Sequence, residues 1–440
     1  MLGQTRQAVT IVALPFLARA RQLFIRATIL STPVSSTMLP VERRASAWLA
    51  LIFALRMLGL FLVLPVFMLE AHKYPGADDV ALVGLAMGIY GLTQALLQIP
   101  FGMASDRFGR KRVIVIGLII FAAGSLLAAA APTLSWLLAG RALQGAGAVS
   151  AAVTALLADL TRDAVRTKAM AMVGASIGLM FALSLVIAPP LAAAIGLQGL
   201  FVLTGLLAIA GIGVVLWGVP PAPPLAAQPQ ASRLGGLAQV LRHPGLLRLN
   251  LGVFVLHAVQ LAMWVAVPAM LVQAGLDKTA HWQAYLPAVL LSFGVMGAVF
   301  AMERRGHLRT VFLMSIAAIL LVQLGLGLLA SLGLGSAALW PLGLLLFIFF
   351  CGFNVLEATQ PSMVSRLAPP QARGAALGVY NTLQSLGFFI GGALGGWLAK
   401  HWGASGLFAA CAGAMLVWLV LAWGMQPQAK MAPASLAKQP

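Results

Sequence analysis

Long apolar runs separated by short polar stretches dominate the chain from residue 46 to residue 424. Each run holds roughly 20 residues or more, the length that an α-helix needs to cross the hydrocarbon core of a bilayer. The pattern predicts an all-α membrane protein with twelve transmembrane helices. We expect them at 47–71, 79–104, 112–131, 134–159, 167–195, 198–218, 246–273, 282–302, 310–331, 340–365, 373–399 and 404–424.

A polar stretch rich in Pro, Ala and Gln divides this pattern in the middle and ends in Arg242-His243-Pro244. Such a composition is typical of a linker. We therefore predict an N-terminal six-helix bundle at 46–218, a cytoplasmic linker at 219–245, a C-terminal six-helix bundle at 246–424 and a tail at 425–440.

The two predicted bundles repeat each other. The stretch from Glu303 to Arg309 is a degenerate copy of the loop around Asp106, offset by 197 residues. Such internal symmetry predicts two pseudo-symmetric six-helix bundles, and it suits a transporter in which one half rocks against the other. A second register, offset by 207 residues, aligns Gly145 with Gly352, Arg166 with Arg373 and Gly196 with Gly403.

Residues 1–45 form an N-terminal tail of uncertain role. The first 40 residues carry arginines but no acidic residue, and their apolar run from Val9 to Leu17 is too short to span a bilayer. One interpretation is a targeting or interfacial segment. The other is a disordered tail or a stretch upstream of the working protein, which would then begin at Met38.

Composition agrees with a membrane protein. The chain is 61% hydrophobic and only 9% charged, with a mean hydropathy of +0.97, which argues against a soluble globular protein. The net charge of +18 does not indicate nucleic-acid binding, because most of the basic residues fall in the tails and in the loops predicted on one side. Lys and Arg mark the cytoplasmic side. Both termini are therefore expected there, in a multi-pass protein of the cell inner membrane in contact with anionic lipid.

The stretch from Gly102 to Ile114 falls between the predicted second and third helices. It reads G-x-x-x-D-R-x-G-R-K and places Asp106 among four cations. This pattern resembles the signature loop of the major facilitator superfamily. The resemblance implies the fold of that superfamily, and it implies that the helix starting at Arg373 approaches the loop.

The free N–H groups at the start of that helix carry partial positive charge, which makes them a partner for Asp106. Arg110 follows Asp106 by four residues and is expected to reach both Asp106 and Asp159. The contact between Asp106 and the helix that starts at Arg373 would join the two halves and hold the outward-facing state. The predicted cytoplasmic gate comprises Gly102, Asp106, Arg107, Gly109, Arg110, Asp159 and Arg373.

Four ionisable residues are predicted at membrane depth, where charge is costly and usually functional: Arg56, Arg141, His257 and Glu357. The low dielectric favours the protonated form of a carboxylate, which suits Glu357 as a proton carrier. Arg141, His257 and Glu357 are our candidates for proton coupling. The alternatives are snorkelling for the arginines and structural hydrogen bonding for the other two.

Two further runs resemble superfamily motifs. Arg141 to Gly147 is similar to the R-x-x-Q-G-x-G motif of the fourth helix, whose arginine the resemblance associates with proton coupling in drug antiporters. The fifth predicted helix resembles the antiporter motif G-x-x-x-G-P-x-x-G-G, with small residues replacing the glycines. Its members here are Ser184, Ala188, Pro189 and Ala192.

Hydrogen-bonding side chains recur at helical spacing on several predicted helices, as in a substrate cavity, although such residues also hold membrane helices together. The predicted cavity comprises Arg56, Tyr90, Gln94, Gln144, Gln260, Trp264, Asn354, Tyr380, Asn381 and Gln384.

The runs from Phe53 to Leu60, Asn354 to Thr359 and Leu377 to Asn381 resemble the YajR-like branch of bacterial inner-membrane drug exporters. The resemblance implies drug:proton antiport, and we expect no soluble domain after the last helix. We predict a secondary transporter, monomeric and without cofactor or metal, for proton-coupled efflux of small molecules. The alternative is uptake or facilitated diffusion of a polar or anionic metabolite, which two membrane arginines suit equally. No nucleophile elbow, metal-ligand spacing or phosphate-binding loop in the sequence favours an enzyme.

Overall fold

The structure, a computed structural model, describes residues 37–221, 237–333, 335–369 and 372–424. The N-terminal tail up to residue 36, most of the linker and the C-terminal tail lie outside the described residues. The helices are α2 Pro40–Ala71, α3 Val80–Phe108, α4 Arg110–Ala129, α5 Leu134–Ala146, α6 Ser150–Asp159, α7 Asp163–Gly213, η1 Val214–Gly218, α9 Pro244–Gln273, η2 Lys278–Ala280, α10 Trp282–Arg304, α11 Leu308–Leu332, η3 Gly335–Ala338, α12 Leu339–Leu367 and α13 Arg373–Trp423.

The predicted all-α membrane fold is confirmed. Within the described residues, nine helical stretches are long and apolar enough to cross a membrane. Two of these, Ala164–Gly218 and Arg373–Trp423, each contain two of the predicted helices, and α10 supplies the remaining one. α2 begins seven residues before the predicted start, because Pro40 opens the helix and Glu42 accepts from the Leu39 N–H at 2.7 Å.

Glycines at equivalent places turn the chain in both halves. Gly196 and Gly403 join two spans within α7 and α13, with φ of 67° and 68°. Gly109 and Gly306 end the loops after α3 and α10, with φ of 96° and 93°. Positive φ costs glycine nothing, so both registers of the sequence repeat appear as repeated backbone geometry.

One predicted helix, 134–159, is interrupted. α5 ends at Ala146 and α6 begins at Ser150. The break occurs where α4 and α5 touch closely: a Cβ on Gly147 would lie 2.4 Å from the Gly117 carbonyl oxygen. Glycine permits both this approach and the non-helical backbone of residue 147.

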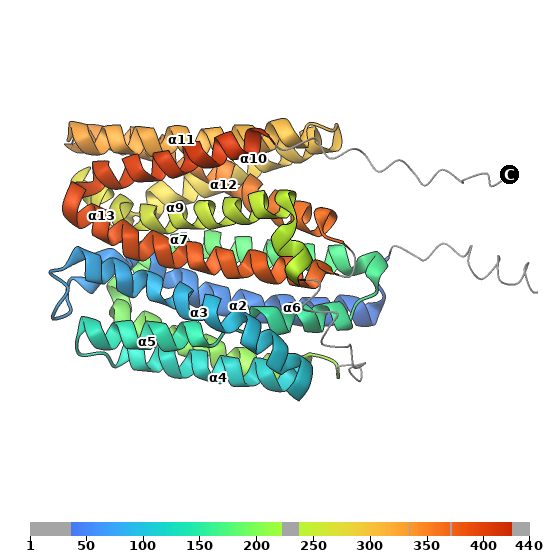
Figure 1. Cartoon of the computed structure of the whole chain (residues 1–440). Coiled ribbons are helices and arrows are strands. Elements are labelled where there is room, and N and C mark those ends of the chain that lie inside the picture. The colour runs from blue at the N-terminus through green and yellow to red at the C-terminus, as the bar shows by residue number, and fades with distance from the viewer. Residues whose placement is uncertain (1–36, 222–236, 334, 370–371, 425–440) are drawn as a thin grey trace, which may run out of the picture.

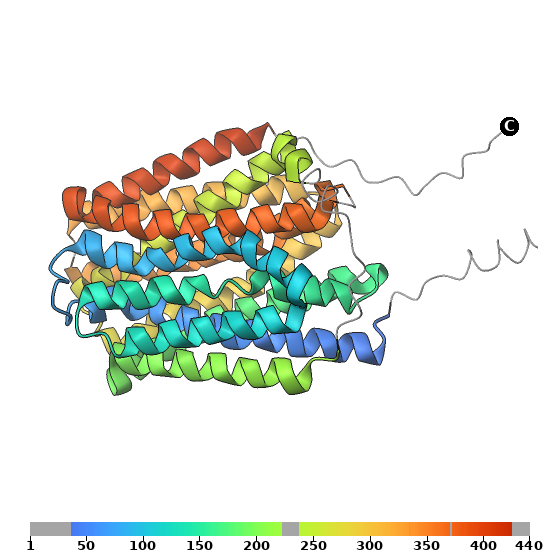
Figure 2. The same cartoon turned by 60° about the horizontal axis from the view of Figure 1, so that its bottom comes forward.

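The helices run side by side in one elongated bundle (Figures 1 and 2). We call α2 to η1 the first half and α9 to α13 the second half. The end of the bundle that holds residues 105–112 is the loop end, and the opposite one is the far end. The start of α2 and the end of α13 both lie at the loop end (Figure 1), where Arg248 donates to the Gly424 carbonyl oxygen at 2.8 Å.

Backbone-to-backbone packing joins the halves toward the far end. A Cβ on Gly84 of α3 would lie 2.5 Å from the Gly392 oxygen of α13, and one on Gly88 would lie 2.7 Å from the Phe389 oxygen. Gly387, Gly391 and Gly395, spaced four residues apart, meet α9 on another side of α13. Nearer the loop end, a Cβ on Gly374 or Gly378 would meet no described atom within 4 Å.

Candidate transport site

A titratable cluster lies in the second half, where α9, α12 and α13 meet. His257 Nε2 lies 3.3 Å from Glu357 Oε2 and 2.8 Å from Gln384 Nε2. Gln384 also donates to Glu357 Oε1 at 3.4 Å, and the other ring nitrogen of His257 lies 2.9 Å from the Val253 carbonyl oxygen. Three helices thus hold one carboxylate against one imidazole, an arrangement that can exchange a proton.

The two titratable groups differ in exposure. The His257 side chain is 2% exposed and the Glu357 side chain 33%. Phe353 and Phe388 cover the imidazole edge-to-face, with ring centroids 5.9 and 5.0 Å away. Phe353 also packs on Phe181 of the first half at 5.9 Å. The Glu357 side chain is therefore partly accessible, although its Oε2, which faces the imidazole, is buried, and the imidazole itself lies under aromatic rings.

A second polar cluster surrounds Arg56 in the first half. Its guanidinium donates to Ser150 Oγ at 3.0 Å, to the Tyr90 hydroxyl at 2.6 Å and to Gln94 Oε1 at 3.2 Å. It also lies over the Phe121 ring, 5.5 Å from the centroid. Arg56 is 1% exposed, so the snorkelling alternative is wrong for this residue.

Arg141 lies on the other side of Tyr90, with its guanidinium carbon 5.2 Å from the ring centroid. It donates to Gln144 Oε1 at 2.9 Å and to the Met87 carbonyl oxygen at 3.2 Å. Gln144 in turn donates to Ser125 at 2.8 Å. Arg141 is also 1% exposed and does not snorkel.

The structure divides the predicted coupling and cavity residues between these two clusters. Within the described chain, Arg141 makes no hydrogen bond or ion pair with His257 or Glu357, so the predicted coupling residues form no single group. The remaining predicted cavity residues all lie on helices of the second half, and the buried Tyr380 is near enough to Glu357 to be affected by its charge. Asn354 donates to Ser292 at 2.9 Å, Trp264 packs on Tyr285 at 5.5 Å, and Gln260, Tyr380 and Asn381 lie on α9 and α13.

Sequence reasoning missed the serines that complete these networks: Ser150, Ser125 and Ser292. A serine in an apolar helix carries little signal, because its hydroxyl can bond its own backbone. Ser125 does so here, donating to the Phe121 oxygen at 2.8 Å.

The gate residues form an ion-pair network within the first half. Arg110 pairs with Asp106 and, through Nε, with Asp159 at 3.0 Å, and it also donates to Ser105 at 2.8 Å. The expected reach of Arg110 to both carboxylates is confirmed, although Gly109 breaks the helix between Asp106 and Arg110. The other gate residues lie nearby or on the facing helix: Gly102 on α3, and the exposed Arg107 and Arg373. The contact between Asp106 and the start of α13 stays a prediction.

The small residues of the antiporter-like motif form one buried face of α7: Ser184, Ala188, Pro189 and Ala192. Ser184 donates to the Phe181 oxygen at 2.6 Å, so its hydroxyl is satisfied within the helix. The face fits close helix packing, and its role in antiport stays a prediction.

Ion pairs that the sequence did not indicate join the halves at the far end. Lys278 Nζ lies 2.8 Å from Glu70, which also binds Lys73, and Lys400 Nζ lies 2.9 Å from Asp79. The Lys400 hydrogen bond lowers the pKa of Asp79, and the Glu70 hydrogen bond raises the pKa of Lys278. Both pairs favour closure at this end.

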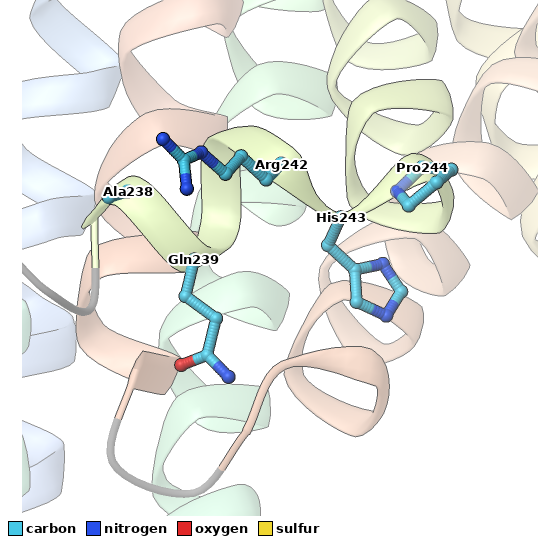
Figure 3. A pocket seen from close by; sticks show the side chains of 5 residues that line it. All are labelled: Ala238, Gln239, Arg242, His243 and Pro244. Carbon is cyan, nitrogen blue, oxygen red and sulfur yellow. The ribbon is translucent and has the colours of Figure 1, made fainter.

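A surface cavity of about 470 Å³ lies at the entry to α9, and its lining residues belong to neither polar cluster (Figure 3). Ala238, Gln239, Arg242, His243 and Pro244 line it. His243 caps α9 by accepting from the Leu246 N–H at 3.3 Å, which explains its position without a ligand. Among the described residues, no group of three or more His, Cys, Asp or Glu side chains could hold a metal ion.

Comparison with known proteins places this architecture in a family. The protein-family model described as Major Facilitator Superfamily matches residues 46–391 of this chain, with a further match at 302–439. The chain is 42% identical over 393 residues to the inner membrane transport protein YajR of Escherichia coli (strain K12), covering 88% of this chain and 85% of that protein. It is 29% identical over 371 residues to the multidrug resistance protein MdtH of Aeromonas hydrophila subsp. hydrophila, covering 80% and 86%.

Among solved structures, the human organic anion transporter MFSD10 (TETRAN) superposes with a TM-score of 0.64. The match covers 87% of this chain and 100% of that one at 19% identity, and therefore shows the fold alone. The chain belongs to the major facilitator superfamily and is a multi-pass membrane transporter, not an enzyme.

Proposed function

We propose that this transporter is a proton-coupled exporter of small molecules in the bacterial inner membrane. The observation that carries the proposal is the contact between His257 and Glu357, with Gln384 bound to both. An ionisable pair at membrane depth is energetically costly, which marks it as a candidate functional site. The partial exposure of Glu357 lets it load and release a proton.

Glycine packing and ion pairs join the halves at the far end, which supports access to Glu357 from the loop end. Arg110, Lys111 and Arg112 lie at the loop end, which makes it the cytoplasmic side by the distribution of basic residues. Both termini are then cytoplasmic. The bundles at 46–218 and 246–424 rock about the central clusters as a monomer, and the similarity to a multidrug resistance protein favours export.

Uptake or facilitated diffusion of a polar or anionic metabolite is the second candidate. The observation that favours it is the pair of buried arginines in the first half, Arg56 and Arg141. A permanent positive charge attracts an anionic solute in either direction of transport.

The deciding experiment measures substrate-dependent proton movement in proteoliposomes across a panel of compounds. The Glu357→Gln variant should lose gradient-driven accumulation completely, while exchange of labelled substrate continues, because the amide keeps the shape but carries no exchangeable acid proton. Asp78→Asn, which removes an exposed carboxylate from the far-end loop before α3, is the matched control and should behave as wild type. Unchanged accumulation in Glu357→Gln would remove that residue from the mechanism. Transport without any proton movement in the wild type would favour facilitated diffusion.

A further inference from the structure

Two buried arginines in the first half have no carboxylate partner among the residues that the structure describes. Arg110, 9% exposed, pairs with Asp106 and Asp159. Arg56 and Arg141, each 1% exposed, form ion pairs with no acidic side chain of the described chain. The deeper cations are thus the ones whose charge is left uncompensated.

The acceptors around these two guanidinium groups are all neutral. They are a hydroxyl, an amide oxygen or a carbonyl oxygen in every case, from Ser150, Tyr90, Gln94, Gln144 and Met87. The Nε–H of each arginine is buried and has no acceptor within the described residues. Each group therefore keeps a full positive charge and one free donor.

Such a charge costs several kcal/mol in a low-dielectric interior unless an anion compensates it. The carboxylate of Glu357, in the second half, contacts His257 and Gln384 instead. Binding of a negatively charged group from outside the chain would offset the cost of burying these two positive charges.

We propose, resting on the proposed transport function, that Arg56 and Arg141 bind the anionic group of an organic substrate. Carboxylates, sulfonates and phosphate monoesters share the required chemistry, because their oxygens accept two parallel N–H bonds from a guanidinium. Tyr90 lies between the two arginines, with its hydroxyl bound to one and its ring facing the other. Phe121 and Phe67 add apolar faces next to the guanidinium groups. The site thus takes an anion attached to an apolar body, and relative motion of the halves opens it.

The test is equilibrium binding to the purified full-length protein in nanodiscs. The anionic probes are naphthalene carboxylate, naphthalene sulfonate and naphthyl phosphate, with naphthalene carboxamide as neutral isostere and naphthylmethylamine as cation. Matching sets of probes, in which benzene or hexane replaces naphthalene, extend the range of probe size. The variants are Arg56→Gln, Arg141→Gln and the double variant. Arg248→Gln, which removes a guanidinium from the loop end, is the control.

The wild type should bind at least one anion about 10-fold or more tightly than its neutral isostere. Each single Gln variant should lose about 10- to 100-fold of that affinity, as for the loss of a charged hydrogen bond, and the double variant should lose all preference for anions. Arg248→Gln should bind as wild type. Melting curves without probe check that each variant is folded.

Equal binding of anion and amide by the wild type, unchanged anion affinity in both single variants, or no anion binding on any frame would overturn the proposal. Because binding is measured without transport, its failure differs from failure of the proposed function. Proton movement driven only by neutral or cationic compounds would sustain the transporter and refute the anion site. Anion binding without substrate-dependent proton movement would sustain the anion site and refute the proposed proton-coupled transport.

Discussion

The polar clusters of the two halves pair corresponding helices with contrasting chemistry. In the first half, Arg56 on α2 donates to Ser150 on α6 at 3.0 Å. In the second half, His257 on α9 lies 3.3 Å from Glu357 on α12. Ser150 and Glu357 are separated by 207 residues, the same register that aligns Gly145 with Gly352. In the first half, the permanent cation Arg56 thus faces the neutral hydroxyl of Ser150. At the corresponding place in the second half, the titratable base His257 faces the acid Glu357.

This difference separates two tasks that a coupled transporter must perform. The guanidinium groups of the first half stay charged at any working pH, so they respond to the charge of a solute. The imidazole and carboxylate of the second half change charge with proton uptake. Under the proposals above, substrate and proton are bound by opposite halves, and rocking of the halves links them.

The largest effect is expected from giving the first half a carboxylate at the position that corresponds to Glu357. In Ser150→Glu, the new carboxylate should pair with Arg56 and occupy the anion site, lowering anion affinity by about 100-fold. Ser150→Gln introduces a side chain of the same bulk as Ser150→Glu but without charge, and it should lose clearly less anion affinity. Both affinities are measured with the naphthalene probe set. Equal losses would show that bulk, rather than charge, explains the effect.

An intermediate effect is expected at Arg141. Arg141→Lys keeps the charge but loses the planar fork, and should retain partial coupled transport with a shifted pH optimum. Arg141→Ala should lose coupling. The measurement is the pH profile of substrate-driven proton movement in proteoliposomes. Wild-type profiles for both variants would exclude Arg141 from coupled transport.

The smallest effect is expected at the ends of the bundle, where the halves open and close. Asp106→Asn should weaken the predicted contact with the start of α13 and favour the state open at the loop end. The free energy of this contact is expected to be of order 1 kcal/mol, as for a partly exposed charge contact. The measurement is thiol labelling of single cysteines at the two mouths, in a background lacking Cys351 and Cys411.

Asp79→Asn is the matched variant at the other end, since Asp79 pairs with Lys400 across the halves. It should shift labelling in the opposite direction, toward the far-end mouth. Because Lys400 lowers the pKa of Asp79, the pair is intact above the ordinary range of that carboxyl and weakens as pH falls through the lowered pKa. Identical labelling of Asp106→Asn and wild type at both mouths would exclude the loop-end latch.

The sequence alone determined the helices, their number and the internal repeat. A chain in lipid must satisfy its backbone hydrogen bonds within each span, so apolar length predicts helices directly. The repeat also aligned the positions at which the structure turns the chain in each half, Gly109 with Gly306 and Gly196 with Gly403. The contact from Arg110 to Asp159 was also predictable, because both lie at the same end of their helices.

Only the tertiary structure decided which polar residues meet. Helical spacing orders side chains along one helix, but it does not say which neighbouring helix they face. Arg56 reaches Ser150 across 94 residues of sequence, and Lys278 reaches Glu70 across 208. The same packing separated Arg141 from Glu357, which the sequence had grouped by membrane depth and by resemblance to a superfamily motif. Depth in the membrane is a property of one helix, whereas partnership depends on how several helices pack, and that geometry divided the charges between the two halves.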